Sequence, residues 1–200
     1  MKLVWWGRQA FTWLLIQRAK RQGLRIGKNV RVSRRPYFGG EPFLISIGDH
    51  VTVSFNVHFI NHDGGTWVFR DEPEYKGLQR FGRIDILDNV FIGANTTILP
   101  GVTIGPNVVV GAGSVVTRDL PRDAVYAGTP ARFICTLDEY VRRSAARCTY
   151  YPPEVASNLK RLRQVLMKQY PHPPVTGGRQ PAPAVDVRQA VLAANGGRPG

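Results

Sequence analysis

The sequence is poor in cysteine. Its two cysteines, Cys135 and Cys148, lack the short spacing that is typical of redox pairs and metal-binding motifs. Two cysteines also cannot supply the set of disulfides that holds a small secreted domain together. We therefore expect a reduced, cytoplasmic protein that needs no metal ion.

Acidic residues are scarce as well. The chain has 14 Asp and Glu against 27 Lys and Arg, a formal net charge of +13. This excess favours anionic partners such as phosphorylated ligands, acidic lipids or nucleic acid. No helix-turn-helix, RNA-recognition sheet or zinc module is evident, so we expect no nucleic-acid binding. No acid precedes Glu41, whereas ten basic residues do: Lys2, Arg8, Arg18, Lys20, Arg21, Arg25, Lys28, Arg31, Arg34 and Arg35.

The sequence also lacks a long hydrophobic run. The apolar stretch from Leu3 to Ile16 is interrupted by Arg8 and Gln9 and is shorter than the roughly 20 residues of a membrane span. No small-residue cleavage site of a secretory signal follows it. Residues 1–25 are predicted to form a basic, Trp-rich helix. Such a helix could lie on the inner face of an anionic membrane, cap the neighbouring fold or pack between subunits.

What the chain does have is a six-residue repeat. Between Ile86 and Pro121 the pattern occurs six times without a break: ILDNVF, IGANTT, ILPGVT, IGPNVV, VGAGSV and VTRDLP. The first positions are Ile86, Ile92, Ile98, Ile104, Val110 and Val116, and the fifth are Val90, Thr96, Val102, Val108, Ser114 and Leu120. This period is typical of a β-solenoid, in which each block is one short strand and a corner.

Three blocks would complete one triangular coil, so positions 18 apart should stack. We expect Ile86 beneath Ile104, Ile92 beneath Val110 and Ile98 beneath Val116, with glycine at the second position turning the corner. The same phase recurs upstream from Ile26, which predicts an all-β solenoid over residues 26–136. Two stretches interrupt the phase: a short bulged corner at 36–46 and a long excursion loop at 63–82.

The run IGANTTILPGVTIGPNVVVGAGSVVTRDLPRDAVYAGTPARFI resembles the left-handed β-helix (hexapeptide-repeat) acyltransferases, and is most similar to the polysaccharide and sugar O-acetyltransferases of the galactoside, maltose and xenobiotic group. The resemblance implies a left-handed parallel β-helix, acetyl-CoA as co-substrate and a homotrimer with active sites between subunits. It also implies transfer to a sugar hydroxyl of a cell-surface polysaccharide, its lipid-linked precursor or a related glycan.

His62 is the candidate catalytic residue. In the family a histidine ends a coil where an extended loop leaves the prism, and His62 in INHDGG matches that placement. A sugar hydroxyl needs a base to attack a thioester, and imidazole titrates near neutral pH. Asp63 or a backbone carbonyl could orient the ring. The alternative is an ordinary loop histidine without a catalytic role.

The resemblance also implies contacts with acyl-CoA and with the acceptor. Five residues stand at positions where the family contacts acyl-CoA: Ala94, Ala112, Thr117, Arg118 and Arg132. Small residues admit the pantetheine arm, and guanidinium groups pair with phosphate. For the acceptor we expect contacts from Asn56, Asn61 and Trp67, whose indole could stack on a sugar ring.

The remaining segments carry less information. Residues 137–170 have helical periodicity, and residues 171–200 are rich in Pro, Gly and Ala, which predicts a disordered tail. Two other functions stay open at this point: an N-acyltransferase acting on an amino sugar, and a catalytically inactive β-helix scaffold at the membrane.

Overall fold

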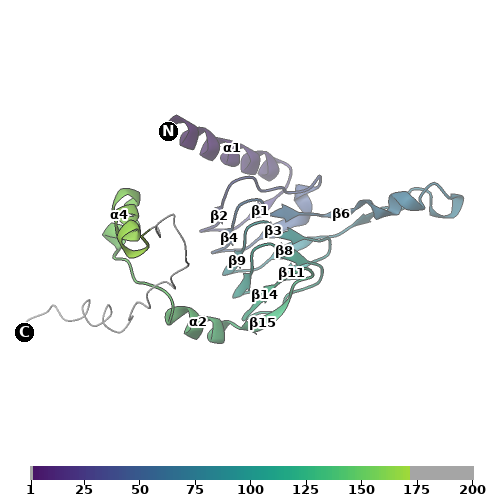
Figure 1. Cartoon of the computed structure of the whole chain (residues 1–200). Helices are drawn as coiled ribbons and strands as arrows, with labels where there is room; N and C mark the ends of the chain where they lie inside the picture. The colour runs from purple at the N-terminus through teal and green to yellow at the C-terminus, as the bar shows by residue number, and fades with distance from the viewer. Residues whose placement is uncertain (1, 172–200) are drawn as a thin grey trace, which may run out of the picture. The chain divides into compact units, whose positions relative to one another are not determined.

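The computed structural model describes residues 2–171, with side chains described from Ala10 onward. The chain divides into two compact units, Met1–Val141 and Arg142–Gly200. The first unit consists of short strands stacked in layers, with a helix at one end and a projecting arm (Figure 1). The expected disordered tail lies outside the described residues, apart from its first residue.

Three sheets of stacked strands form the three sides of a prism in the first unit. Sheet A contains β1 (Arg25–Ile26), β3 (Ile45–Ile47), β8 (Ile84–Ile86) and β11 (Thr103–Ile104). Sheet B contains β2 (Arg31–Val32), β4 (Thr52–Val53), β9 (Val90–Ile92), β12 (Val108–Val110), β14 (Ala124–Ala127) and β15 (Arg132–Thr136), and sheet C contains β5 (His58–Phe59), β10 (Thr97–Ile98) and β13 (Val115–Val116). All pairs within the three sheets are parallel except β14 with β15.

The predicted stacking is confirmed. Ile104 pairs with Ile86, Val110 with Ile92 and Val116 with Ile98, each 18 positions apart. All the first and fifth positions of the six blocks are buried, with at most 2% of each residue exposed. The chain visits sheets A, B and C in turn, so each coil adds one layer to a core that every block supplies with two inward side chains.

The early coils are longer than 18 residues. Strands of the first and second coils pair at an offset of 21, as in Arg25 with Ser46 and Arg31 with Thr52. Between the second and third coils the offset is 39, as in Ile45 with Ile84. The extra residues are the two interruptions that the sequence predicts, and both leave the prism at the edge between sheets C and A, which we call the C/A edge.

The glycines at the second positions do not turn the corners as expected. The left-handed conformation falls instead on fourth positions, including Asn89, Asn95 and Asn107 with φ between 56° and 58°. Gly93 has a different role: a Cβ at Gly93 would lie 2.4 Å from the backbone nitrogen of Ala112 in the next coil. Asparagine tolerates positive φ. Its side-chain amide can also donate a hydrogen bond to the asparagine at the same corner of the next coil, as Asn89 Nδ2 does to Asn107 Oδ1 at 2.7 Å.

The helix α1 (Lys2–Arg21) caps the first coil. Ala19 is buried in the core cluster together with Leu24, and Ile16 packs against that cluster. The other side of the helix is open, since Trp13 and Leu14 are both more than half exposed. Of the three placements that the sequence left open for this helix, packing on the first coil is the one that these contacts describe. No helix within the described residues is both long and apolar enough to cross a membrane.

The excursion loop forms an arm on the C/A edge. Strand β6 (His62–Asp63) pairs antiparallel with β7 (Arg80–Phe81), and the 3-10 turns η2 (Gly64–Val68) and η3 (Pro73–Tyr75) lie between them. Figure 1 shows the arm projecting from the stacked strands. A third 3-10 turn, η1 (Pro42–Leu44), belongs to the shorter interruption. Beyond the sheets follow α2 (Leu137–Ala145), α3 (Pro153–Ala156) and α4 (Leu159–Gln169).

Candidate active site

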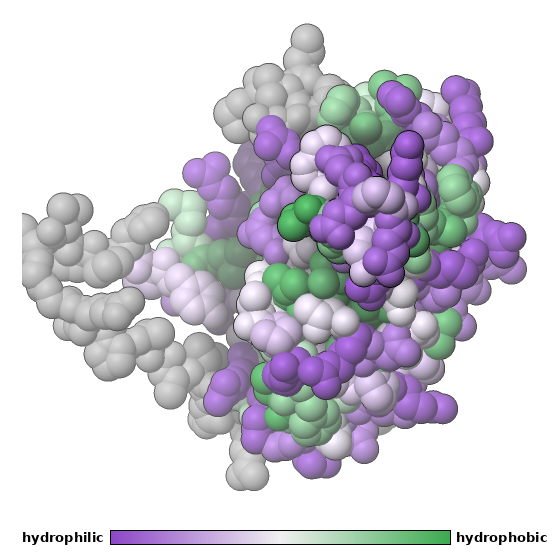
Figure 2. All heavy atoms as spheres, turned by 90° about the vertical axis from the view of Figure 1, so that its right-hand side faces the viewer, coloured by the Kyte–Doolittle hydropathy of each residue, from purple (hydrophilic) through white to green (hydrophobic). Residues whose placement is uncertain are grey.

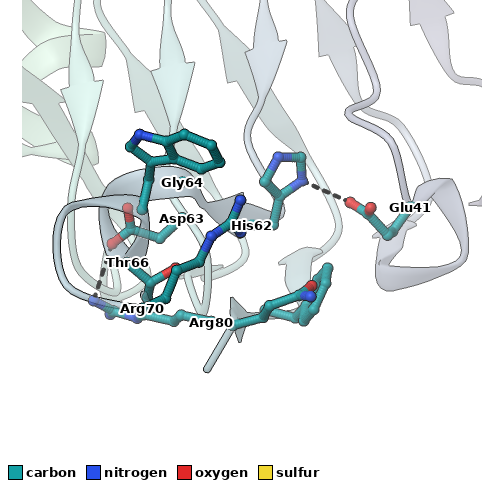
Figure 3. Close-up of a pocket in the computed structure, with 10 residues that line it drawn as sticks. Glu41, His62, Asp63, Gly64, Thr66, Arg70 and Arg80 are labelled. Atoms are coloured by element: carbon teal, nitrogen blue, oxygen red, sulfur yellow. Dashed lines mark hydrogen bonds and ion pairs between the residues drawn. The ribbon is translucent and has the colours of Figure 1, made fainter. Parts of the chain in front are cut away.

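His62 and Glu41 lie within ion-pair distance of each other at the base of the arm. His62 Nδ1 lies 2.9 Å from Glu41 Oε2, and the two side chains are 45% and 24% exposed. Figure 3 shows the imidazole turned toward this carboxylate. A carboxylate only accepts hydrogen bonds, so Nδ1 carries the proton and donates a hydrogen bond to Glu41. The neutral ring then has its lone pair on Nε2, the nitrogen that a general base would use.

The register of the coils brings these two residues together. Glu41 and His62 are 21 positions apart, the same offset that pairs Tyr37 with His58 in the first two coils. The shorter interruption therefore stacks on the start of the arm. Sequence analysis missed Glu41, because the offset becomes visible only once the first two coils have been paired.

Asn61 holds the loop that carries Glu41. Its amide donates to the carbonyl oxygens of Glu41 at 2.7 Å and Phe38 at 3.3 Å, and the residue is 0% exposed. Gly39, at φ +67°, packs so closely that a Cβ would lie 2.3 Å from Asn61 Oδ1. We expected Asn61 to contact the acceptor. The structure instead gives it a supporting role, because its side chain is enclosed and its amide hydrogens are used by the loop.

Asp63 does not orient the imidazole. Its Oδ1 accepts a hydrogen bond from the Gly65 backbone at 2.9 Å, which caps η2, and its Oδ2 lies 3.7 Å from Arg80. The sequence suggested Asp63 or a backbone carbonyl as the group that orients the imidazole. In the structure the partner of His62 Nδ1 is the carboxylate of Glu41.

A pocket of about 440 Å³ opens beside His62 and is lined mainly by the arm. Trp67 is one of the lining residues, and the Arg70 guanidinium lies 4.5 Å from the centre of its ring. Arg80 and Phe81 line the pocket from β7. The combination of a flat aromatic face with polar side chains suits a sugar, whose ring has apolar C–H faces and polar hydroxyls. Figure 2 looks onto this side, where hydrophilic residues surround small hydrophobic patches.

The other expected site residues divide between two edges of the prism. Thr117 and Arg118 are exposed directly after β13, on the C/A edge that also carries His62. Two strand spacings separate β13 from β5, so the two positions lie roughly 10 Å further along this edge.

The remaining residues lie at the edge between sheets B and C, the B/C edge. Ala94 accepts a hydrogen bond from Gly113 there at 2.7 Å, and Ala112 is exposed in the next coil. Asn56 bonds Asn95 at 2.8 Å, so it stacks at this corner and does not line the pocket beside His62. Arg132 is exposed just after a turn that bonds back to Gly113 and Val115. One chain thus carries the two halves of the expected site on separate edges.

Known proteins that are similar to this chain include O-acetyltransferases. The family model described as bacterial transferase hexapeptide (six repeats) matches residues 84–118. Protein CapG from Staphylococcus aureus is 46% identical over 133 residues, which cover 66% of this chain and 76% of CapG. The galactoside O-acetyltransferase of Escherichia coli (strain K12) is 35% identical over 123 residues, and this chain spans only 57% of its length.

A solved structure shows a partial likeness. The crystal structure of a maltose O-acetyltransferase from Clostridium difficile 630 aligns with 58% of this chain and 71% of its own, at 30% identity and a TM-score of 0.47.

Proposed function

The chain belongs to the hexapeptide-repeat acyltransferase family, and we propose that it transfers an acetyl group from acetyl-CoA to a sugar hydroxyl, with His62 as general base. The observation that carries the proposal is the His62–Glu41 contact beside the pocket, because it leaves Nε2 as the basic nitrogen. The acceptor would be a cell-surface polysaccharide, its lipid-linked precursor or a related glycan. The name of the galactoside relative supports a sugar, as does the exposed face of Trp67.

In this mechanism His62 moves the proton and Glu41 supports the imidazole. His62 Nε2 takes the proton of the acceptor hydroxyl as its oxygen attacks the thioester carbonyl, and the C–S bond breaks as the tetrahedral intermediate collapses. The imidazolium then returns the proton to the departing thiolate. Glu41 holds the ring through Nδ1 and stabilises the positive charge that His62 carries between the two transfers. The transfer is direct and needs no covalent enzyme intermediate.

The division of the site between two edges favours a trimer. Residues on the B/C and C/A edges of one prism cannot meet, since a whole sheet separates the two edges. If three copies pack around a three-fold axis, the B/C edge of one subunit faces the C/A edge of the next. Ala94, Ala112 and Arg132 would then bind acetyl-CoA opposite His62 of the neighbour. We also infer a left-handed coil from the family, an exception to the usual right-handed crossover.

Binding of acetyl-CoA is the first test of this function. We expect isothermal titration calorimetry to show specific binding of acetyl-CoA and weaker binding of dephospho-CoA, because guanidinium groups pair with the 3′-phosphate. Arg132→Ala should weaken acetyl-CoA binding, whereas Arg25→Ala, at the far end of the prism in sheet A, should not. If neither nucleotide binds the wild-type protein, the chain is a scaffold and the proposed function is wrong.

Glu41 gives a second test. We expect Glu41→Ala to lower kcat roughly tenfold to a hundredfold at unchanged KM for acetyl-CoA, since a hydrogen bond to a charged group contributes about 1.5–3 kcal/mol. Nitrogen-15 NMR of the imidazole should show the Nδ1–H tautomer in the wild type and a tautomer mixture in the variant. Glu74→Gln, an acid of the arm that does not line the pocket, is the matched control. A wild-type kcat for Glu41→Ala would remove Glu41 from the mechanism.

A further inference from the structure

The pocket beside His62 holds a cation that no carboxylate neutralises. Glu41 pairs with His62, and Asp63 lies 3.7 Å from Arg80; Figure 3 draws both contacts as dashed lines. Arg70 lines the same pocket, and it takes part in no ion pair within the part of the chain that the structure describes. Because a guanidinium group stays protonated in proteins, the pocket keeps this positive charge.

The turn η2 and the residue after it fix the position of Arg70. Its backbone N–H donates to the carbonyl oxygen of Thr66 at 2.9 Å, and its guanidinium lies over the Trp67 ring at 4.5 Å from the centre. Phe69 packs edge-on against Tyr75, with ring centroids 5.5 Å apart. A guanidinium group that contacts an aromatic ring through its flat face keeps the N–H groups at its rim for a planar acceptor.

The acids of the arm leave Arg70 unpaired. Asp71, Glu72 and Glu74 follow it closely in the chain, and all three are exposed. None of them lines the pocket, and none forms an ion pair with Arg70. Three carboxylates therefore stand within four residues of the guanidinium without using its N–H groups, which remain available to a ligand.

The proposed trimer would bring no acid from the facing edge. In it the C/A edge, which carries the pocket, faces the B/C edge of the next subunit. That edge is made of five corners, at residues 33–36, 54–57, 93–96, 111–114 and 128–131. None of the five contains Asp or Glu, whereas Arg34 and Arg35 stand in the first and Arg132 follows the last. A ligand between the two edges would meet positive charge on both sides, which favours an anion.

We propose that Arg70 selects an acidic sugar as the acceptor, through a bidentate contact of its guanidinium with a carboxylate or phosphate group on the sugar. The inference rests on the proposed function, because it names the acceptor class of the same site. Two parallel N–H···O bonds orient a ligand as well as attract it. The anion on Arg70 would thus direct one ring hydroxyl toward Nε2 of His62. A neutral sugar would lack this anchor.

Ligand-observed NMR on the full chain with CoA present tests the selectivity. The probes are pairs of methyl glycosides in the gluco, galacto and manno configurations, each pair differing only in a carboxylate that replaces the hydroxymethyl group. We expect the wild type to bind the acidic member of at least one pair roughly tenfold to a hundredfold more tightly, the usual contribution of a hydrogen bond to a charged group. Methyl glucoside 6-phosphate then distinguishes phosphate from carboxylate as the preferred anion.

Variants of Arg70 should remove this preference. Arg70→Gln should weaken binding of the acidic members only, and Arg70→Lys should restore part of it, because lysine keeps the charge but lacks the planar fork. The control is Lys76→Gln, which removes the same charge from the arm at a residue that does not line the pocket. An equal loss in the control would show general attraction of anions to a basic protein and would overturn the site. Equal wild-type binding of both members, or of neither, would also overturn it.

Turnover keeps this inference apart from the proposed function. If only the inference is wrong, free CoA is released with neutral glycosides, and Arg70→Gln leaves kcat/KM for acidic glycosides at the wild-type value. If the proposed function is wrong, calorimetry shows no binding of acetyl-CoA and no glycoside releases CoA. Circular dichroism of each variant must match the wild type, so that a loss of binding is not a loss of folding.

Discussion

Replacement of His62 by alanine is expected to lower kcat by roughly 10² to 10⁴, because general-base catalysis contributes on that scale. The neighbouring groups cannot replace the imidazole as base, since Glu41 lies on the Nδ1 side of the ring and Asp63 caps η2. Affinity for acetyl-CoA should stay nearly the same, since the residues proposed to bind it lie elsewhere. Release of free CoA thiol in the presence of glycoside acceptors measures kcat, and calorimetry measures the affinity.

The matched control for this variant is His50→Asn. His50 lies at another edge of the prism, at φ +56°, where its Nδ1 is 2.8 Å from Asn89 Oδ1. Asparagine tolerates this backbone conformation and can keep a hydrogen bond to Asn89, so activity should be retained. Unchanged turnover in His62→Ala would show that the residue is an ordinary loop histidine. Loss of acetyl-CoA binding together with turnover would point to a structural effect.

Replacement of Phe59 by alanine should cost about 3–5 kcal/mol of unfolding free energy, the usual range for a buried phenylalanine. Phe59 is fully buried in sheet C, and its ring stacks on Phe38 with centroids 5.5 Å apart. The cavity would form three positions before His62, and the Phe38 carbonyl also accepts a hydrogen bond from Asn61. We therefore expect the Glu41 loop to loosen as well.

Urea denaturation followed by circular dichroism measures this cost, at matched protein concentration because oligomers are stabilised by mass action. Phe91→Ala is the control, since Phe91 is 45% exposed and points outward between the buried Val90 and Ile92. Its expected cost is below about 1 kcal/mol, as for most exposed positions. A Phe59→Ala cost as small as that of the control would contradict the packing described here.

Much of the fold could be predicted because its signal is local and repeated. A six-residue period needs only the identities of neighbouring residues, and β-branched side chains at first positions mark the inside of every coil. The stacking of Ile86 with Ile104 follows directly from three blocks per coil. The role of the glycines could not be predicted in the same way: the sequence shows a glycine at position 93, but not that the nearby backbone of Ala112 leaves no room for a Cβ there.

The candidate site was only partly predictable. The sequence by itself determined that the chain coils, which side chains face inward, and that His62 stands where the arm leaves the prism. Only the tertiary structure decided what surrounds His62, because contacts between distant residues depend on the length of each coil. The 21-residue offset places Glu41 on the imidazole and encloses Asn61, and the three-sided path separates Ala94 from Arg118. Neither the offset nor the edge on which a residue lies can be read until the strands are paired.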